Sequence, residues 1–226
     1  MYLLHYAPDN ASLIIRLVLE EAGLPYQTAL VDRKARRDDS DEYRNVAPTG
    51  LIPALETPQG VLFETAAILL WLCDRHGLGP VEAAPARISL LKWLFFLSNT
   101  LHADLRQLFY PQYYVPADAK DVHHSLVSAR LQRHFALVDQ AAAEMPGHFT
   151  PGGILAPYAA CLMRWSVLYP EGQLPWFVLK DYSTLAQMAE RLEARPATQH
   201  LIRAEGLGPT PFTAPSLASP PEGSAT

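Results

Sequence analysis

Hydrophobic and polar positions in the first third of the chain form a pattern that predicts a small α/β unit. Residues 2–6 are a short apolar run that stops at a turn-forming sequence, which is typical of a buried strand. Apolar residues then recur at helical spacing from Leu13 to Ala22, and Gly23 with Pro25 ends this predicted helix. Residues 26–31 predict a second strand.

Two more short strands are predicted at residues 54–57 and 61–63, because these segments flank the turn-forming sequence Pro58-Gln59-Gly60. A helix with one apolar face follows them. The order of strand, helix, strand, hairpin and helix is the thioredoxin-like arrangement. We therefore predict an α/β thioredoxin-like N-terminal domain over residues 1–76, followed by a linker over residues 77–85.

The remaining two-thirds of the chain predict an all-α C-terminal domain over residues 86–205. Apolar stripes at helical spacing recur there, and the stripe from Leu126 to Val138 is the most regular. A later helix, which carries Tyr158, is predicted to begin at Pro151, directly after Thr150. The last two helices are predicted at residues 181–194 and 196–204. Residues 206–226 are rich in Pro, Ser, Thr and Ala, which indicates a tail that is mobile or draped over the surface.

Composition narrows the class of protein. Of the 226 residues, 49% are hydrophobic and 18% are charged, which is typical of a globular chain. The net charge of −5 gives no reason to expect a nucleic-acid partner. No apolar run reaches the roughly 18 residues that a membrane span needs, and no signal sequence opens the chain. Cys73 and Cys161 lie far apart, which favours a reducing compartment, so we expect a cytoplasmic protein.

Two short segments carry candidate binding chemistry. Pro53 stands where the strand at residues 54–57 should begin, and a proline cannot donate to a sheet ladder. The backbone of Ile52 is then free to pair with an extended peptide as an added strand. Glu64 and Thr65 open the next predicted helix, whose first N–H groups can hold an anion. The sequence thus predicts a peptide-binding edge followed by an anion-binding helix start.

These two segments, in this order and spacing, resemble the glutathione-binding half of the cytosolic glutathione transferase family. The likeness is greatest to the bacterial beta-like and theta-like members. The resemblance implies that Ile52, before a cis Pro53, binds the cysteinyl backbone of glutathione. It also implies that Glu64 and Thr65 hold the γ-glutamyl end. Glutathione as co-substrate, the absence of a metal, and a homodimer are further implications of the resemblance.

The turn between the first strand and the first helix is the candidate site for stabilising the glutathione thiolate. Ser12, at the helix start, is the first choice as hydrogen-bond donor to the sulfur, and Asn10 is the second. Tyr6 is a third candidate, since other classes of the family use a tyrosine at the strand end. Ala11 occupies the place where beta-class enzymes carry a cysteine. The alternative is that Ser12 only caps the helix.

Further contacts to glutathione are expected on two other segments. The sequence around His102 resembles the beta-class segment in which a histidine leans over the glutathione site, and Asn99 lies about one helical turn earlier. His102 could donate to the thiolate or to a leaving group, or it could simply pack against the small domain. Lys34, Arg36 or Arg37 could reach the glycyl carboxylate, although a charge run is commonly a solvated face.

The reaction implied by the resemblance is attack of enzyme-bound glutathione thiolate on a small hydrophobic electrophile, as in detoxification. Aromatic residues are candidates for lining the electrophile pocket, or for core or dimer contacts: Phe109, Tyr110, Tyr113 and Tyr114. One alternative is a glutathione-dependent isomerase or reductase of the same fold, and the missing cysteine at Ala11 counts against a reductase. Another alternative is a non-catalytic binding module with the glutathione transferase fold.

Overall fold

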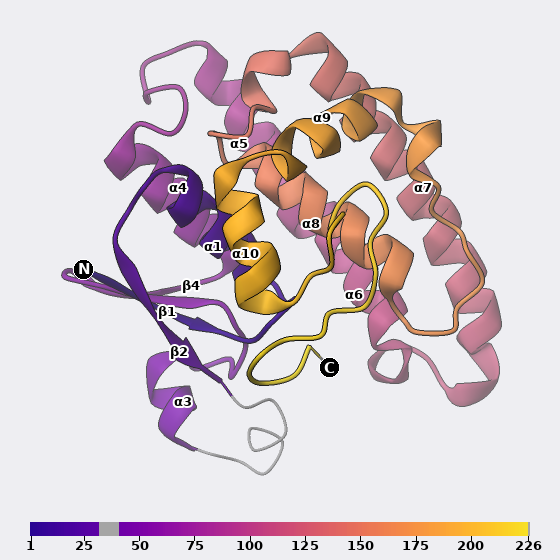
Figure 1. Cartoon of the computed structure of the whole chain (residues 1–226). Helices are drawn as coiled ribbons and strands as arrows, with labels where there is room; N and C mark the ends of the chain where they lie inside the picture. Colours follow the sequence, from indigo (N-terminus) through magenta and orange to yellow (C-terminus); the bar gives the residue numbers. More distant parts are fainter. Residues whose placement is uncertain (32–40, 226) are drawn as a thin grey trace.

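An α/β unit and a set of packed helices make up the protein (Figure 1). The structure is a computed structural model that describes residues 1–31 and 41–225. The strands of the α/β unit are β1 (Tyr2–Tyr6), β2 (Tyr26–Leu30), β3 (Ala54–Thr57) and β4 (Gly60–Phe63). Its helices are α1 (Ser12–Glu21), α3 (Asp41–Val46) and α4 (Thr65–His76).

The strands form a mixed sheet in the order β2-β1-β3-β4. β1 runs parallel to β2, with Tyr2 opposite Tyr26, and antiparallel to β3, with Leu4 opposite Leu55. β3 and β4 form an antiparallel hairpin. This arrangement confirms the predicted thioredoxin-like fold class, because one parallel crossover through α1 is followed by a hairpin on the other side of β1.

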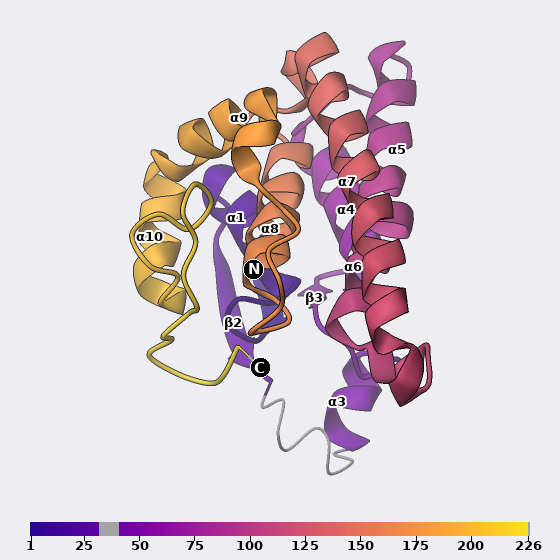
Figure 2. The ribbon, with the colours of Figure 1, turned by 90° about the vertical axis from the view of Figure 1, so that its right-hand side faces the viewer.

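The helical part begins with α5 (Ala86–Phe96), which continues through a π-helical segment (Leu97–His102) into α6 (Ala103–Phe109). The later helices are α7 (Lys120–Glu144), α8 (Leu155–Leu168), α9 (Ser183–Glu193) and α10 (Pro196–Glu205). Short 3-10 turns lie between them, at Pro111–Tyr113, Ala117–Ala119, Pro146–His148 and Leu179–Asp181. Figure 2 shows these helices stacked beside the α/β unit. The helical C-terminal region completes the predicted architecture.

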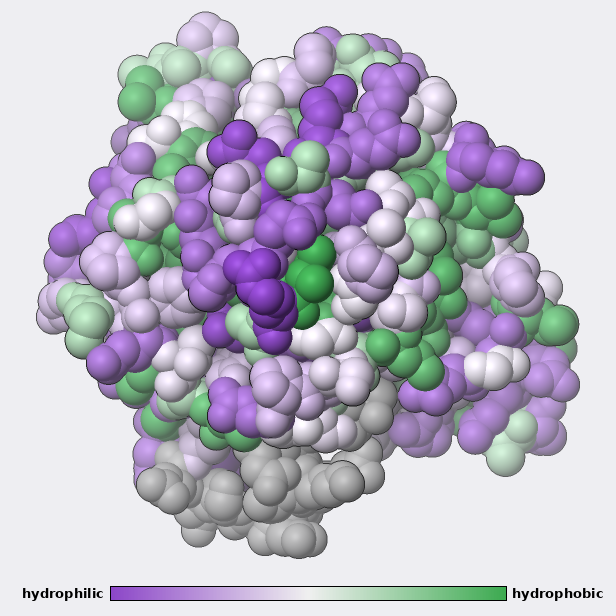
Figure 3. Space-filling view, in the orientation of Figure 1, coloured by the Kyte–Doolittle hydropathy of each residue, from purple (hydrophilic) through white to green (hydrophobic). Residues whose placement is uncertain are grey.

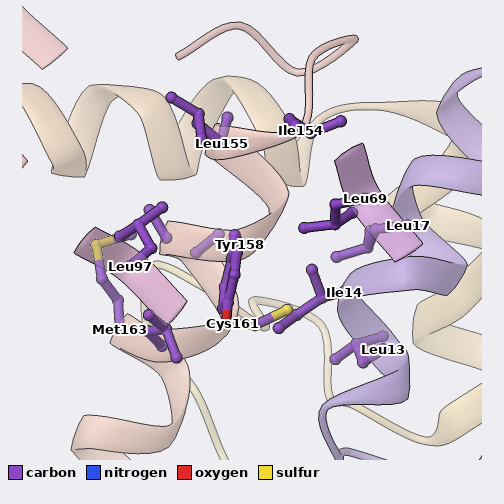
Figure 4. Close-up of a cluster of buried hydrophobic side chains, with 14 of the residues drawn as sticks. Leu13, Ile14, Leu17, Leu69, Leu97, Ile154, Leu155, Tyr158, Cys161 and Met163 are labelled. Carbon is purple, nitrogen blue, oxygen red and sulfur yellow. The ribbon is translucent and has the colours of Figure 1, made fainter. Parts of the chain in front are cut away.

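Helix α8 is the centre of the molecule. Its residues from Leu155 to Ser166 are all buried, as expected for a helix that is apolar all round. Figure 4 shows Tyr158 and Cys161 of α8 facing Ile14 and Leu17 of α1, so the two parts of the chain share one apolar cluster. The division into domains at residues 76 and 86 stays a prediction, although α4 ends at His76 and α5 begins at Ala86.

The start of α8 differs from the prediction. The helix begins at Leu155 and not at Pro151, and the residues between them form a turn in which Gly153 N–H donates to the Thr150 carbonyl at 3.0 Å. Gly153 has no side chain that could cap a helix starting at Pro151, and glycine is a poor helix former. A start at Leu155 also places Pro157 in the first turn, where a missing N–H costs nothing.

The chain after α10 packs back onto the rest of the molecule. Phe212 is only 1% exposed, and Ser219 N–H donates to the Gly206 carbonyl at 2.8 Å. In Figures 1 and 2 this yellow segment returns from α10 toward the end of β2. A Cβ built on Gly223 would come within 2.7 Å of the Leu30 side chain, so the two residues are in close contact. The described part of residues 206–226 therefore packs first on α8 and α9, through Arg164 and Glu193, and only near its end on the α/β unit.

The surface gives no sign of a membrane span. None of the helices in residues 1–31 and 41–225 is both long and apolar enough to cross a bilayer. On the face drawn in Figure 3, hydrophilic and hydrophobic residues are interspersed.

Candidate active site

A cavity of about 590 Å³ opens where the α/β unit meets the helices. Its lining comes from the turn after β1, the loop before β3, the start of α4, and the π-helical segment that leads into α6. Helix α6 with the turn after it, α8 and the loop that follows it, and the C-terminal segment complete the lining. The lining residues relevant to chemistry are Asp9, Asn10, Ala11, Ile52, Pro53, Glu64, Thr65, Ser98, His102, Arg106, Phe109, Tyr110, Tyr113, Tyr158, Trp165, Tyr169, Glu171 and Ala225.

Ile52 and Pro53 lie side by side on the cavity wall, joined by a cis peptide bond. The ladder pairing of β3 begins only at Ala54, which pairs with His5 and Phe63. Ile52 therefore stands just outside the ladder, as its position before Pro53 predicts. An extended peptide could be bound by its main chain at this edge.

Glu64 and Thr65 meet the same cavity at the start of α4. No side chain caps this helix, so its first N–H groups are available to a bound anion. Glu64 has φ 71° and ψ 117°, in the region that favours glycine. A residue other than glycine held there is strained, and such strain is concentrated at functional positions.

Asn10, rather than Ser12, reaches the cavity from the turn after β1. The Asn10 Oδ1 accepts a hydrogen bond from the Ala11 N–H at 2.9 Å, so the side-chain NH₂ must be the group left for another partner. Ser12 is 0% exposed and does not line the cavity. Its Oγ donates to the Ala7 carbonyl at 3.0 Å and accepts from the Ala7 N–H at 3.3 Å. The geometry thus gives no support to Ser12 as donor to sulfur.

The Tyr6 hydroxyl is also turned away from the site. Tyr6 is buried and donates a hydrogen bond to a carboxylate oxygen of Glu222, in the C-terminal segment. Burial, followed by this contact with Glu222, raises the pKa of Tyr6. Tyr6 is absent from the cavity lining, so the phenol is an unsuitable thiolate donor in this chain.

His102 lies on the cavity wall and is a neutral histidine at pH 7. Its Nδ1 is 3.1 Å from the Tyr158 hydroxyl, and its ring packs 5.7 Å from Trp165, centroid to centroid. Burial, helped by the nearby Arg106 charge, lowers the pKa of His102 to about 4. Burial also raises the pKa of Tyr158, which keeps its proton. When Tyr158 donates to Nδ1, the ring proton of His102 sits on Nε2 as a donor.

Asn99 does not line the cavity, and Ser98 does. The reason is the π-helical form of residues 97–102, which the sequence did not reveal. In an α-helix, residues three or four apart share a face. A π-helix turns less per residue, so Asn99, three residues before His102, moves off this face, whereas Ser98, four residues before it, stays in line. Ser98 Oγ contacts the Asn99 Oδ1 at 3.1 Å.

The other predicted contacts divide into three groups. Lys34, Arg36 and Arg37 lie outside the described residues. Three of the predicted aromatics line the cavity, namely Phe109, Tyr110 and Tyr113. Tyr114 instead stacks on His123, with ring centroids 6.5 Å apart.

Sequence reasoning missed Asp9, Trp165 and Tyr169. The Asp9 carboxylate accepts bonds from Trp165 Nε1 at 2.8 Å and from the Tyr169 hydroxyl at 3.3 Å, in addition to the Arg164 guanidinium. The spacing of Trp165 and Tyr169 by four residues was a signal for one helix face, but such aromatics are ordinarily core residues. Among the residues that the structure describes, no cluster of three or more His, Cys, Asp or Glu could hold a metal.

A thioredoxin-like unit with a peptide-binding edge, joined to a helical region that closes the cavity, defines the glutathione transferase architecture. The family model for the N-terminal domain of glutathione S-transferase matches residues 11–75. This match, together with relatives and solved structures of the same class, supports a bacterial glutathione transferase family and the prediction of a transferase.

Two curated relatives and one solved structure illustrate the likeness. Glutathione S-transferase GstA of Escherichia coli O157:H7 is 29% identical, and the match covers 90% of this chain and 98% of GstA. The disulfide-bond oxidoreductase YfcG of Escherichia coli K12 is 26% identical, and the match covers 89% of this chain and 95% of YfcG. The structure of a sphingomonad glutathione S-transferase complexed with glutathione is 26% identical in sequence, with a TM-score of 0.71. The match covers 91% of this chain and 100% of the sphingomonad chain.

Proposed function

We propose that this chain binds glutathione in the cavity and promotes attack of the glutathione thiolate on a small hydrophobic electrophile. The observation that carries the proposal is that Asn10, Ile52 and Glu64, from three separate segments, line one cavity. Ile52 binds the cysteinyl main chain, and Glu64 with Thr65 binds the γ-glutamyl end. The sulfur then lies beside the turn that carries Asn10. The glutathione bound in the sphingomonad relative supports this assignment.

In this proposal Asn10 takes the thiolate-stabilising role. Its side-chain NH₂ donates to the sulfur, and the N-terminal end of α1 adds a favourable partial charge. Lowering the thiol pKa by about two units requires about 2.7 kcal/mol, which one good hydrogen bond and the helix dipole can supply. The neutral His102 donates through Nε2 to the electrophile or its leaving group. Catalysis then consists mainly of positioning and thiolate stabilisation.

The wider predictions belong to the same proposal. We propose a cytoplasmic homodimer that uses glutathione as co-substrate without a metal and acts in detoxification. The name of YfcG favours a second candidate, a glutathione-dependent reductase of the same fold. Ala11 in place of a cysteine argues against mixed-disulfide chemistry by the protein itself.

Calorimetric titration with glutathione, joined to the ultraviolet thiolate band as a function of pH, tests the proposal. We expect one glutathione bound per chain, and we expect the thiol of bound glutathione to have a lower pKa than the thiol of free glutathione. Glu64→Ala should weaken binding at least tenfold. The control is Glu190→Ala, on the exposed face of α9, which should bind as the wild type does. Unaltered binding by Glu64→Ala would place the site elsewhere.

A further inference from the structure

Helix α6 and the turn after it line the cavity with residues that the proposed glutathione contacts do not use. Phe109, Tyr110 and Tyr113 come from this segment, and Trp165 and Tyr169 join them from the end of α8. Flat aromatic side chains of this kind suit a flat apolar ligand. Arg106, also on α6, lines the cavity together with these aromatic residues.

Arg106 is the one lysine or arginine in the described lining of this cavity. Its guanidinium lies over the Tyr110 ring, with the carbon 5.3 Å from the ring centroid. This cation–π contact uses one face of the guanidinium and leaves its N–H edges for another partner. Arg106 is half-buried and always charged, so it presents a positive charge and free N–H donors to a ligand in the cavity.

No carboxylate of the described residues supplies that partner. Arg87, Arg130 and Arg164 each pair with an aspartate at 2.6–2.8 Å. Arg106 has no acidic oxygen within 4.0 Å among residues 1–31 and 41–225. Among the described residues, the other buried or half-buried arginines are thus ion-paired, whereas the arginine at the cavity is not.

The other ionisable residues of the lining do not change this conclusion. Asp9 is neutralised by the Arg164 guanidinium at 2.8 Å. Glu64 sits at the start of α4, with the proposed γ-glutamyl contacts, and Glu171 follows the cis Pro170. His102 is neutral, and so cannot replace Arg106 as an anion receptor.

We propose that the second substrate is an aromatic acid, whose carboxylate Arg106 binds through its N–H edges while the aromatic residues hold the ring. The proposal rests on the proposed function and names the substrate class of the same site. Arginine suits this role because its fork of donors matches a carboxylate in a bidentate pair. An uncharged electrophile of the same shape leaves the guanidinium without an anion.

A matched pair of electrophiles tests the proposal, namely 4-chloro-3-nitrobenzoate and its uncharged amide, 4-chloro-3-nitrobenzamide. In each reaction the thiolate attacks the carbon that bears chlorine, a C–S bond forms, and chloride leaves with the C–Cl bonding pair. The thiol proton has passed to solvent, and nothing is oxidised or reduced. The quantity measured is the ratio of kcat/KM for the benzoate to kcat/KM for the amide.

Arg106→Gln should lower this ratio at least tenfold. The matched control is Arg75→Gln, because Arg75 lies over the Trp71 ring at the same 5.3 Å but does not line the cavity. Arg75→Gln should keep the ratio of the wild type. An Arg106→Gln ratio within twofold of the wild type would overturn the proposal and leave the transferase function intact.

Binding provides a second readout that does not need turnover. Calorimetric titration with 4-nitrobenzoate and with 4-nitrobenzamide, in the presence of S-methylglutathione, should show a preference for the benzoate that Arg106→Gln abolishes. Equal affinities in the wild type, or no benzoate binding, would overturn the anion site. A benzoate preference that depends on Arg106, found together with no affinity for glutathione, would support the anion site and contradict the proposed function.

Discussion

Asp9 and Arg164 form a bidentate ion pair between the turn after β1 and the central helix α8. Arg164 Nε donates to Asp9 Oδ1 and Nη2 to Oδ2, both at 2.8 Å, and both side chains are 0% exposed. Asp9 directly precedes Asn10, and its φ of 48° lies in the left-handed region. The ion pair therefore fixes the turn that presents Asn10 to the cavity.

Asp9→Asn should destabilise the protein strongly. The substitution removes the negative charge but leaves the Arg164 guanidinium buried, and breaking a buried pair in this way costs about 3–5 kcal/mol. Urea unfolding, followed by circular dichroism, measures the loss as a lower midpoint at unchanged slope. Glu144→Gln makes the same chemical change at an exposed position of α7 and should stay within about 0.5 kcal/mol of the wild type. An equally small change in the unfolding free energy of Asp9→Asn would show that the ion pair between Asp9 and Arg164 does not stabilise the fold.

Asn10→Ala should affect catalysis more than stability, and Ser12→Ala should affect stability more than catalysis. Removing the Asn10 amide takes away the proposed donor, so the pKa of bound glutathione should rise by about one unit, equal to about 1.4 kcal/mol. Ser12→Ala leaves the Ala7 N–H and carbonyl without their buried partner, so it should cost about 1–3 kcal/mol of folding free energy. The thiolate absorbance and urea unfolding separate the two effects. A raised thiol pKa in Ser12→Ala alone would return the role to Ser12.

Glu64→Gly and Glu64→Ala should bind glutathione equally weakly but differ in stability. Both substitutions remove the carboxylate from the cavity. Only glycine adopts a φ of 71° without a steric penalty, so the glycine variant should be the more stable by about 1 kcal/mol. Calorimetry gives the affinities and thermal unfolding gives the stabilities. A less stable glycine variant would mean that the backbone at Glu64 is not strained.

The fold and several of the cavity-lining residues were predictable from the sequence, for reasons visible in particular residues. Ile52, Pro53, Glu64 and Thr65 were predictable because proline chemistry and helix starts act over a few neighbouring residues. Ser12 is ambiguous in the sequence, because its hydroxyl could cap a helix, bind a ligand or hold a neighbouring loop. In the structure this hydroxyl bonds to the backbone of Ala7.

Hydrogen bonds between residues far apart in the sequence could not be predicted from local sequence patterns. The bond between Tyr6 and Glu222 joins residues 216 positions apart, and no spacing rule connects them. Asn99 does not line the cavity for a different reason, since the π-helical segment changes which residues share a face, and sequence periodicity assumes an α-helix throughout.

His102 should make folding stability fall in mild acid. Its folded pKa of about 4 is below the unfolded value of about 6.5, so the unfolded chain takes up the proton first. Stability is therefore lost as the pH falls through 6.5, and this loss levels off below 4. Between pH 7.5 and pH 5 the linkage amounts to about 2 kcal/mol. His102→Gln should lose about that much less stability than the wild type over this interval, measured by urea unfolding at both pH values. Equal losses would contradict a neutral His102 in the folded state.

Two truncations, ending at Glu205 and at Pro221, should show which part of the C-terminal segment stabilises the fold. Arg164 donates to the carbonyls of Leu207, Pro211 and Ser216, at 3.0–3.2 Å. A chain that ends at Glu205 loses these acceptors and the buried Phe212, so it should unfold more easily by several kcal/mol, on the scale of losing a buried aromatic residue.

A chain that ends at Pro221 is the matched control. It keeps the three carbonyls and Phe212 but loses the hydrogen bond from Tyr6 to Glu222 and the contact between Gly223 and Leu30, so it should be destabilised by only about 1 kcal/mol. GstA is covered over 98% of its length by 90% of this chain, so about a tenth of this chain has no counterpart in that relative. If both truncations unfold at the same urea concentration as the full chain, the segment is an addition that the fold does not need. If the chain that ends at Glu205 loses much more stability than the chain that ends at Pro221, the residues between these two ends are part of the folded core.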